Sequence, residues 1–157
     1  MKKCFFVIAI AMIISFVGKA QSTKSVYFEL FGPGLAAFNF DTRLSGKDSG
    51  FGGRIGIGGL SVDGAGVVYF PVGVNWLLGK DNRHYFEVGA GVTPVLQTGD
   101  FEDEDGGNLT NTFGHVLFGY RMQPKDGGYT FRVFISPVFG DGFFIPYYGG
   151  VSFGYAF

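Results

Sequence analysis

The fold is decided by residues 86–97, FEVGAGVTPVLQ, in which large apolar side chains alternate with small or polar ones. One set is made of Phe86, Val88, Ala90, Val92 and Leu96, and the other of Glu87, Gly89, Gly91, Thr93 and Gln97. Successive side chains of a strand point to opposite faces, so a period of two predicts a strand with one apolar and one polar face. Residues 129–136 and 145–157 carry the same alternation.

The rest of the chain after residue 20 also predicts strands, because Gly and Pro interrupt every window with a helical period. Polar turns at 45–50, 79–83 and 123–128 and further connections at 32–34, 61–65, 98–111 and 140–144 separate the strands. Eight strands are predicted, at 25–31, 35–43, 51–60, 66–78, 84–97, 112–122, 129–139 and 145–157. Residues 25–43 could instead form one long kinked strand. The even strand number of bacterial single-chain barrels favours a break at 32–34.

The composition of the two faces indicates which face of the strands lies inside the barrel and which lies outside. A soluble lipocalin-like barrel has its apolar side chains inside, whereas a membrane barrel directs them to lipid and lines its lumen with polar ones. Here the second face consists of glycine, hydroxyls and a few charges, which is too sparse in charge for a solvated surface and suits a narrow lumen. The chain has 28 Gly and 18% aromatic residues but only 16% charged ones. We therefore predict an all-β, eight-stranded antiparallel up-and-down transmembrane β-barrel.

A few charged side chains share the polar face and are expected inside the barrel. They are Glu29, Asp41, Glu87, Arg54, Arg121 and Arg132, with His115 on the same face. Three acids and three bases in a lumen must pair, because an isolated charge away from water costs several kcal/mol. We interpret them as a salt-bridged plug; the alternative is a pathway for protons or ions. Eight strands leave an interior just wide enough for side chains to fill, which favours the plug.

Residues 1–20 have the features of a secretory signal peptide. Lys2 and Lys3 precede an apolar run at 4–17, and small residues follow before a cleavage point at Gln21. The run is too short to remain as a membrane helix, since 14 residues span roughly 21 Å of a hydrocarbon core about 30 Å thick. The expected mature protein is a single barrel domain at 21–157.

The mature domain excludes several functional classes by its composition. Cys4 is lost with the signal peptide, which leaves no disulfide and no cysteine-based metal site. The remaining 9 basic and 13 acidic side chains exclude a nucleic-acid binder driven by phosphate neutralisation. No cofactor is expected.

These features together resemble the small outer-membrane β-barrel proteins of Gram-negative bacteria. The most specific element is the end of the chain, where Val151, Phe153, Tyr155 and the terminal Phe157 occupy every second position. In that family an aromatic last strand of this kind is similar to the signal read by the barrel-assembly machinery. The resemblance implies export through the inner membrane, insertion into the outer membrane, and outer-membrane lipids as partners. It implies no single activity, since members are structural anchors, adhesins, narrow channels or lipid-modifying enzymes.

Candidate chemistry outside the lumen charges is sparse. The acidic run of Asp100, Glu102, Asp103, Glu104 and Asp105 fails the pattern of a helix-loop-helix calcium site. We interpret it as a solvated loop, with weak divalent-cation binding beside outer-leaflet phosphates as the alternative. Family members that deacylate lipid A have a serine two residues from a histidine, whereas Leu117 stands two residues after His115. Two distant histidines predict no metal site.

The predicted function is a structural or interaction protein anchored in the outer membrane. A narrow porin-like pore for ions or small solutes is the alternative, because lumen glycines leave space beside the charges. A lipid-modifying enzyme of the outer membrane is the third hypothesis. Other partners, the ligand and the oligomeric state do not follow from these residues.

Overall fold

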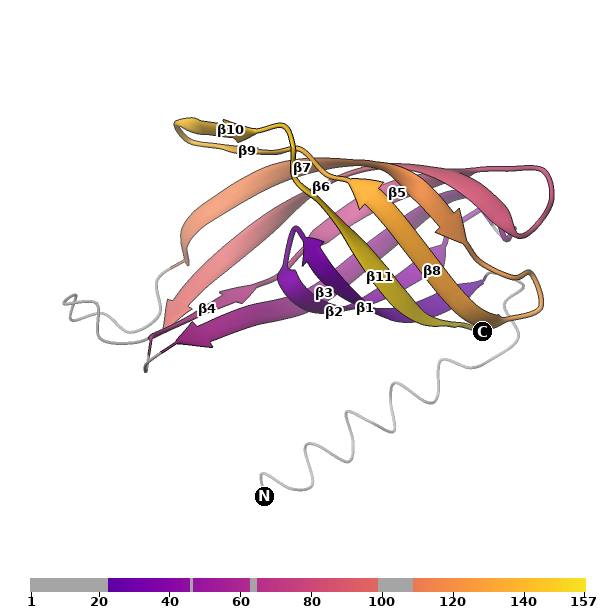
Figure 1. Cartoon of the computed structure of the whole chain (residues 1–157), viewed down its shortest axis with the longest axis horizontal. Coiled ribbons are helices and arrows are strands. Elements are labelled where there is room, and N and C mark those ends of the chain that lie inside the picture. Colours follow the sequence, from indigo (N-terminus) through magenta and orange to yellow (C-terminus); the bar gives the residue numbers. More distant parts are fainter. Residues whose placement is uncertain (1–22, 46, 63–64, 99–108) are drawn as a thin grey trace, which may run out of the picture.

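The structure is a computed structural model, which describes residues 23–45, 47–62, 65–98 and 109–157 (Figure 1). Within these residues the chain forms strands and turns, with no helix. No helix of this part of the chain is long and apolar enough to cross a membrane. The predicted signal peptide at 1–20 and the acidic run at 100–105 lie outside the described residues.

The described residues form eleven strand segments, which together make up the eight strands of a barrel. They are β1 (Lys24–Gly32), β2 (Leu35–Arg43), β3 (Gly50–Val62), β4 (Ala65–Tyr69), β5 (Val72–Leu78), β6 (His84–Thr98), β7 (Leu109–Met122), β8 (Gly128–Ile135), β9 (Val138–Gly140), β10 (Phe143–Ile145) and β11 (Gly149–Ala156). Three of the eight barrel strands are interrupted and consist of two segments each: β4 with β5, β8 with β9, and β10 with β11. Pro71, Pro137 and Pro146 stand at these three interruptions, because proline has no N–H to donate to a ladder.

Antiparallel pairing runs around the whole molecule and closes it. The order is β1, β2, β3, β4 with β5, β6, β7, β8 and β11. β11 then pairs with β1 from Ala156 opposite Ser25 to Val151 opposite Leu30. The predicted fold, an eight-stranded antiparallel barrel, is thereby confirmed.

The stretch at 25–43 forms two strands rather than one kinked strand. β1 and β2 pair along their length, from Lys24 opposite Thr42 to Gly32 opposite Leu35. Their tight connection holds Phe31 and Leu35 at positive φ values of 57° and 58°, which side chains adopt only where a turn demands it. The seventh and eighth predicted strands differ more from the prediction. Their facing ends form the short β9–β10 hairpin, which pairs with β7 only at Gly114 and His115.

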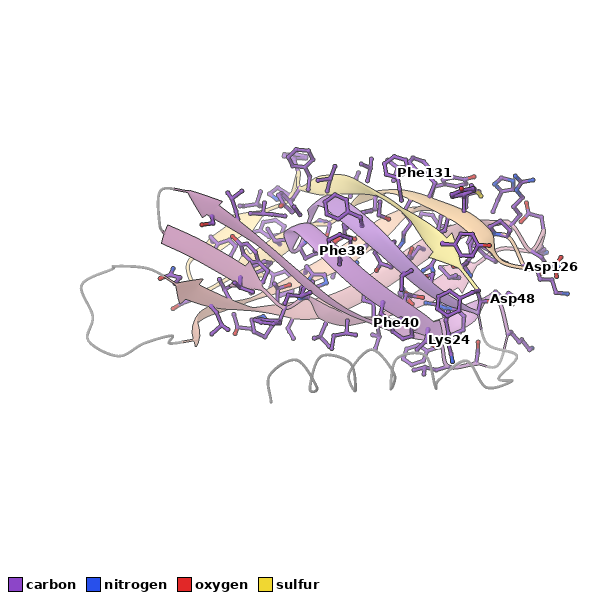
Figure 2. All side chains as sticks on the ribbon, turned by 90° about the horizontal axis from the view of Figure 1, so that it is seen from below. Lys24, Phe38, Phe40, Asp48, Asp126 and Phe131 are labelled. Carbon is purple, nitrogen blue, oxygen red and sulfur yellow. The ribbon has the colours of Figure 1, made fainter. Side chains whose placement is uncertain are left out.

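The outer wall of the barrel is apolar. Figure 2 shows Phe38, Phe40 and Phe131 projecting from it. Phe38 is 69% exposed and Phe153 is 57% exposed, and many other large apolar side chains of the strands are similarly open. The buried side chains instead point into the lumen. Most of them are charged, amide or hydroxyl side chains rather than apolar ones.

The two ends of the barrel differ. At one, here called the turn end, the backbone N–H of Lys24 donates to the carbonyl of Phe157 at 2.9 Å, so both ends of the barrel domain meet there. Figure 2 shows Lys24, Asp48 and Asp126 at this end, which also carries the turns at 44–49, 79–83 and 123–127. The opposite end, here called the loop end, carries the β1–β2 and β9–β10 turns.

Candidate functional site: a charge network in the lumen

Seven charged side chains from six strands point into the lumen and are almost completely buried. They are Glu29, Asp41, Arg43, Arg54, Glu87, Arg121 and Arg132, each no more than 5% exposed. Strand alternation anticipated six of these positions and missed Arg43. The signal was present, since Arg43 stands two residues after Asp41 and so shares its face, but it is the last residue of its strand and adjoins a turn. The expected balance of three acids and three bases is therefore wrong, and the described lumen holds four arginines and three carboxylates.

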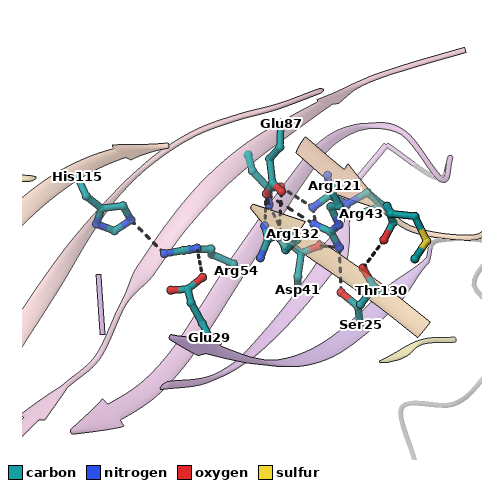
Figure 3. A network of polar contacts seen from close by, with 12 residues as sticks. Ser25, Glu29, Asp41, Arg43, Arg54, Glu87, His115, Arg121, Thr130 and Arg132 are labelled. Atoms are coloured by element: carbon teal, nitrogen blue, oxygen red, sulfur yellow. Dashed lines mark hydrogen bonds and ion pairs between the residues drawn. The ribbon is translucent and has the colours of Figure 1, made fainter. Parts of the chain in front are cut away.

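The larger of two clusters is built around Asp41 and Glu87 (Figure 3). Asp41 accepts from Arg43 at 2.5 Å and from Arg121 at 3.2 Å. Glu87 accepts from Nε of Arg132 at 2.8 Å and pairs again with Nη2 of the same guanidinium, a two-point contact. Arg121 lies 3.6 Å from Glu87 and so links the two carboxylates.

Neutral side chains also contact the charges of this cluster. The Asn75 amide donates to Asp41 at 2.6 Å and to Glu87 at 2.7 Å, and its oxygen accepts from Arg43. Ser25 accepts from Arg121 at 2.9 Å. The guanidinium carbon of Arg132 lies 4.4 Å from the centre of the Tyr27 ring, a cation–π contact. These groups hold the charges in fixed positions and give each carboxylate several donors.

The contacts cross the lumen rather than run along its wall. Asp41 is on β2 and Arg121 on β7, and four strand-to-strand steps separate β2 from β7 in either direction around the barrel. Their 3.2 Å contact therefore joins opposite sides of the wall. The members of the cluster come from β1, β2, β5, β6, β7 and β8, so they converge from most of the barrel circumference.

A smaller cluster forms a second layer. Arg54 donates to Glu29 at 3.3 Å and to Nε2 of His115 at 3.4 Å. Arginine only donates, so Nε2 of His115 accepts and its Nδ1 carries the proton that Thr93 Oγ1 receives at 3.4 Å. β3 and β7 face each other across three steps, so this layer also spans the lumen.

The two histidines lie far apart in the barrel. His84 contacts the Tyr120 hydroxyl at 2.5 Å at the turn end, far along the barrel from His115. Two residues from His115, Leu117 is buried and carries no nucleophile. In the part of the chain that the structure describes, no three His, Cys, Asp or Glu side chains gather as metal ligands would.

The predicted assembly signal lies on the outer wall. Phe153, Tyr155 and Phe157 are about half exposed, and Val151 is partly buried. Phe153 packs on Phe131 at a ring-centroid distance of 5.0 Å. Recognition of this last strand by the barrel-assembly machinery stays a prediction. The predicted cation-binding run at 100–105 falls outside the described residues.

Comparison with known proteins supports the fold and goes no further. No known family model matches the sequence, and no curated protein is significantly similar to it. The crystal structure of the N-terminal β-barrel domain of Pseudomonas aeruginosa OprF is similar, with a TM-score of 0.61. The match covers 87% of this chain and 96% of that one at 12% sequence identity. At this identity the likeness concerns the barrel architecture and not the lumen residues.

Proposed function

We propose that this chain is an integral outer-membrane β-barrel whose lumen is closed by its own ion pairs, and that it serves as a structural or interaction protein. The observation that carries the proposal is the inverted distribution of side chains. Large apolar side chains are open on the outer wall, while seven charges are buried inside. In water this arrangement would expose an apolar band around the molecule, whereas in a bilayer it satisfies both surfaces.

The predicted signal peptide and the aromatic last strand support the outer membrane as the location. Both are features of the family that the sequence resembles, and they imply the barrel-assembly machinery and outer-membrane lipids as partners. In membrane fractionation we expect the protein with the outer membranes, with a gel mobility that changes on heating. Recovery as a soluble periplasmic protein would contradict the proposal.

Closure of the lumen rests on the two layers that cross it. The Asp41–Arg121 contact and the Arg54–His115 contact each join distant walls with side chains less than 6% exposed. Two layers make closure robust, since disturbing one leaves the other in place. A plugged barrel would act through what its surface binds rather than through transport.

A narrow pore for ions or small solutes is the second candidate, and one observation favours it. Several buried polar atoms of the network have no hydrogen-bond partner among the described protein atoms, including Nε of Arg121, Nη1 of Arg132 and Oε1 of Glu29. Buried polar groups of this kind are commonly satisfied by water. A hydrated lumen with one more arginine than carboxylates would favour anions. An enzyme ranks third, because Leu117 occupies the place of a nucleophile beside His115.

Ion conductance in planar bilayers tests the choice. For the purified mature protein we expect negligible current, and also for Arg121→Ala, because the Arg54 layer remains closed. A steady current in the wild-type protein, with a selectivity that Arg121→Ala changes, would reject the plug and establish the pore.

A further inference from the structure

A groove opens on the outer wall at the turn end of the barrel. It lies between the 44–49 turn and the end of β5 and has a volume of about 390 Å³. Its walls include Ser45, Lys47, Ser49, Phe51, Trp76 and Leu78. The groove lies outside the lumen, although Arg43 of the lumen network donates to the backbone carbonyl of Gly50, which lines the groove, at 3.0 Å.

One side of the groove is apolar and continues the outer wall. Phe51 and Trp76 are direct partners across the β3–β5 pairing, and their rings meet edge to face at 6.3 Å. Trp76 is 51% exposed and Leu78 is 52% exposed, which leaves both open for a ligand. Val74, two residues from Trp76, extends the same face toward the middle of the barrel.

The other side of the groove is polar and carries a positive charge. The Ser45 hydroxyl donates to the carbonyl of Ser49 at 2.7 Å, which shapes the turn around Lys47. Lys47 forms no ion pair with a carboxylate of the described residues.

The neighbouring carboxylates are engaged within the chain. Asp48 accepts the Thr23 hydroxyl at 2.5 Å. In the adjacent turn, Asp81 accepts the backbone N–H groups of His84 at 2.8 Å and Arg83 at 3.2 Å. The His84 N–H contributes most to lowering the pKa of Asp81 below its ordinary value, so this carboxylate stays ionised and bonded to its own turn.

The charges of the two barrel ends are strongly unequal. The first residue of β1 and the turn-end connections contain five basic residues and three acidic ones: Lys24, Lys47, Lys80, Arg83 and Lys125, and Asp48, Asp81 and Asp126. Among the described residues of the connections at the other end, the charged residue is Asp141, which is acidic. An anionic ligand is therefore attracted to the end that holds the groove.

We propose that the groove binds an anionic phospholipid of the bilayer, with the phosphate at Lys47 and the serine hydroxyls and the upper acyl chain along Phe51, Trp76 and Leu78. This inference rests on the proposed membrane location. Tryptophan is favoured at the membrane interface, where an apolar ring meets a polar headgroup. A lysine beside it supplies the charge that basic pockets use to select anionic lipids.

Trp76 is the single tryptophan of the chain, so its fluorescence reports directly on the groove. The full mature protein would be reconstituted into phosphatidylcholine vesicles in which dibrominated phosphatidylglycerol or dibrominated phosphatidylcholine replaces an increasing share of the lipid. Bromine quenches tryptophan on contact, so the two curves give the relative affinity of the groove for the two headgroups. We expect a roughly fivefold preference for the anionic lipid, the size that one lysine near a membrane surface provides.

Variants distinguish a specific lipid site at Lys47 from a general attraction of anionic lipid to the positive charge of this barrel end. Lys47→Gln should abolish the preference and Lys47→Arg should keep it. Lys125→Gln, in a turn of the same end outside the groove, should leave it unchanged; heat-dependent gel mobility confirms that each variant is folded. Equal quenching by both lipids in the wild type, or an equal loss in Lys47→Gln and Lys125→Gln, would overturn the site. If neither brominated lipid quenches Trp76, the membrane location itself is wrong.

Discussion

Replacing Glu87 by glutamine should destabilise the barrel strongly, because it removes the single carboxylate that pairs with Arg132 among the described residues. The substitution keeps the size of the side chain and leaves its oxygen able to accept from Asn75. It removes the negative charge and replaces one acceptor oxygen by an NH₂ donor, which cannot accept from Arg132. Arg132 is 1% exposed, and its remaining close contact is the Tyr27 ring at 4.4 Å.

The magnitude follows from what remains after the change. Removing one partner of a buried pair leaves an uncompensated charge, which costs about 3–5 kcal/mol. Arg121→Ala is expected to cost less, about 1.5–3 kcal/mol, the range of hydrogen bonds to charged groups. In that variant Asp41 keeps Arg43 and Glu87 keeps Arg132. The order of the two variants therefore tests the pairing and not merely the presence of charge.

Urea unfolding in lipid vesicles, followed by Trp76 fluorescence and by far-ultraviolet circular dichroism, measures both variants. Asp126→Asn is the matched control, since it removes a carboxylate from an exposed turn and should change the free energy of unfolding by less than about 0.5 kcal/mol. If water screens the lumen, Glu87→Gln should cost under about 1 kcal/mol, as exposed pairs do. That result, or a greater loss in Arg121→Ala than in Glu87→Gln, would refute the plug as described.

Three further predictions concern the wall, the lumen glycines and export. Val133→Arg places a charge on the outer face, where Val133 is 46% exposed, and should lower the free energy of unfolding in vesicles by about 2–4 kcal/mol. Gly91→Ala would press a methyl group against the backbone carbonyl oxygen of Val72 and set it 2.7 Å from Nε2 of His115, and it should cost about 1–3 kcal/mol in the same assay, whereas Gly89→Ala, whose nearest contact is the Val74 carbonyl oxygen at 3.0 Å, should cost less. N-terminal sequencing of the mature protein should begin at Gln21; a retained leader would contradict the predicted cleavage.

The strands were predictable because their evidence is local. Alternation in residues 86–97 needs only neighbouring positions to assign Glu87 to one face and Val88 to the other. The interruptions at Pro137 and Pro146 were harder to predict, since the pairing that proline removes depends on which strand lies beside it. Arg43 shares the face of Asp41 by the same alternation, but it was missed because it is the last residue of its strand and adjoins a turn.

The sequence alone predicted a barrel, most of the charged side chains that face inward, and the chemical types that line the lumen, because side-chain direction in a strand follows from a period of two. Only the tertiary structure decided which charges meet. Asp41 and Arg121 are separated by 80 positions, and Ser25 and Arg121 by 96. Their contacts depend on the register of every intervening strand and on the closure of β11 against β1, which set the height of each side chain in the lumen. If the pairing register of one strand shifted by one residue, the charges of that strand would turn to the other face. The pairing of charges is therefore a property of the closed barrel and not of any single segment.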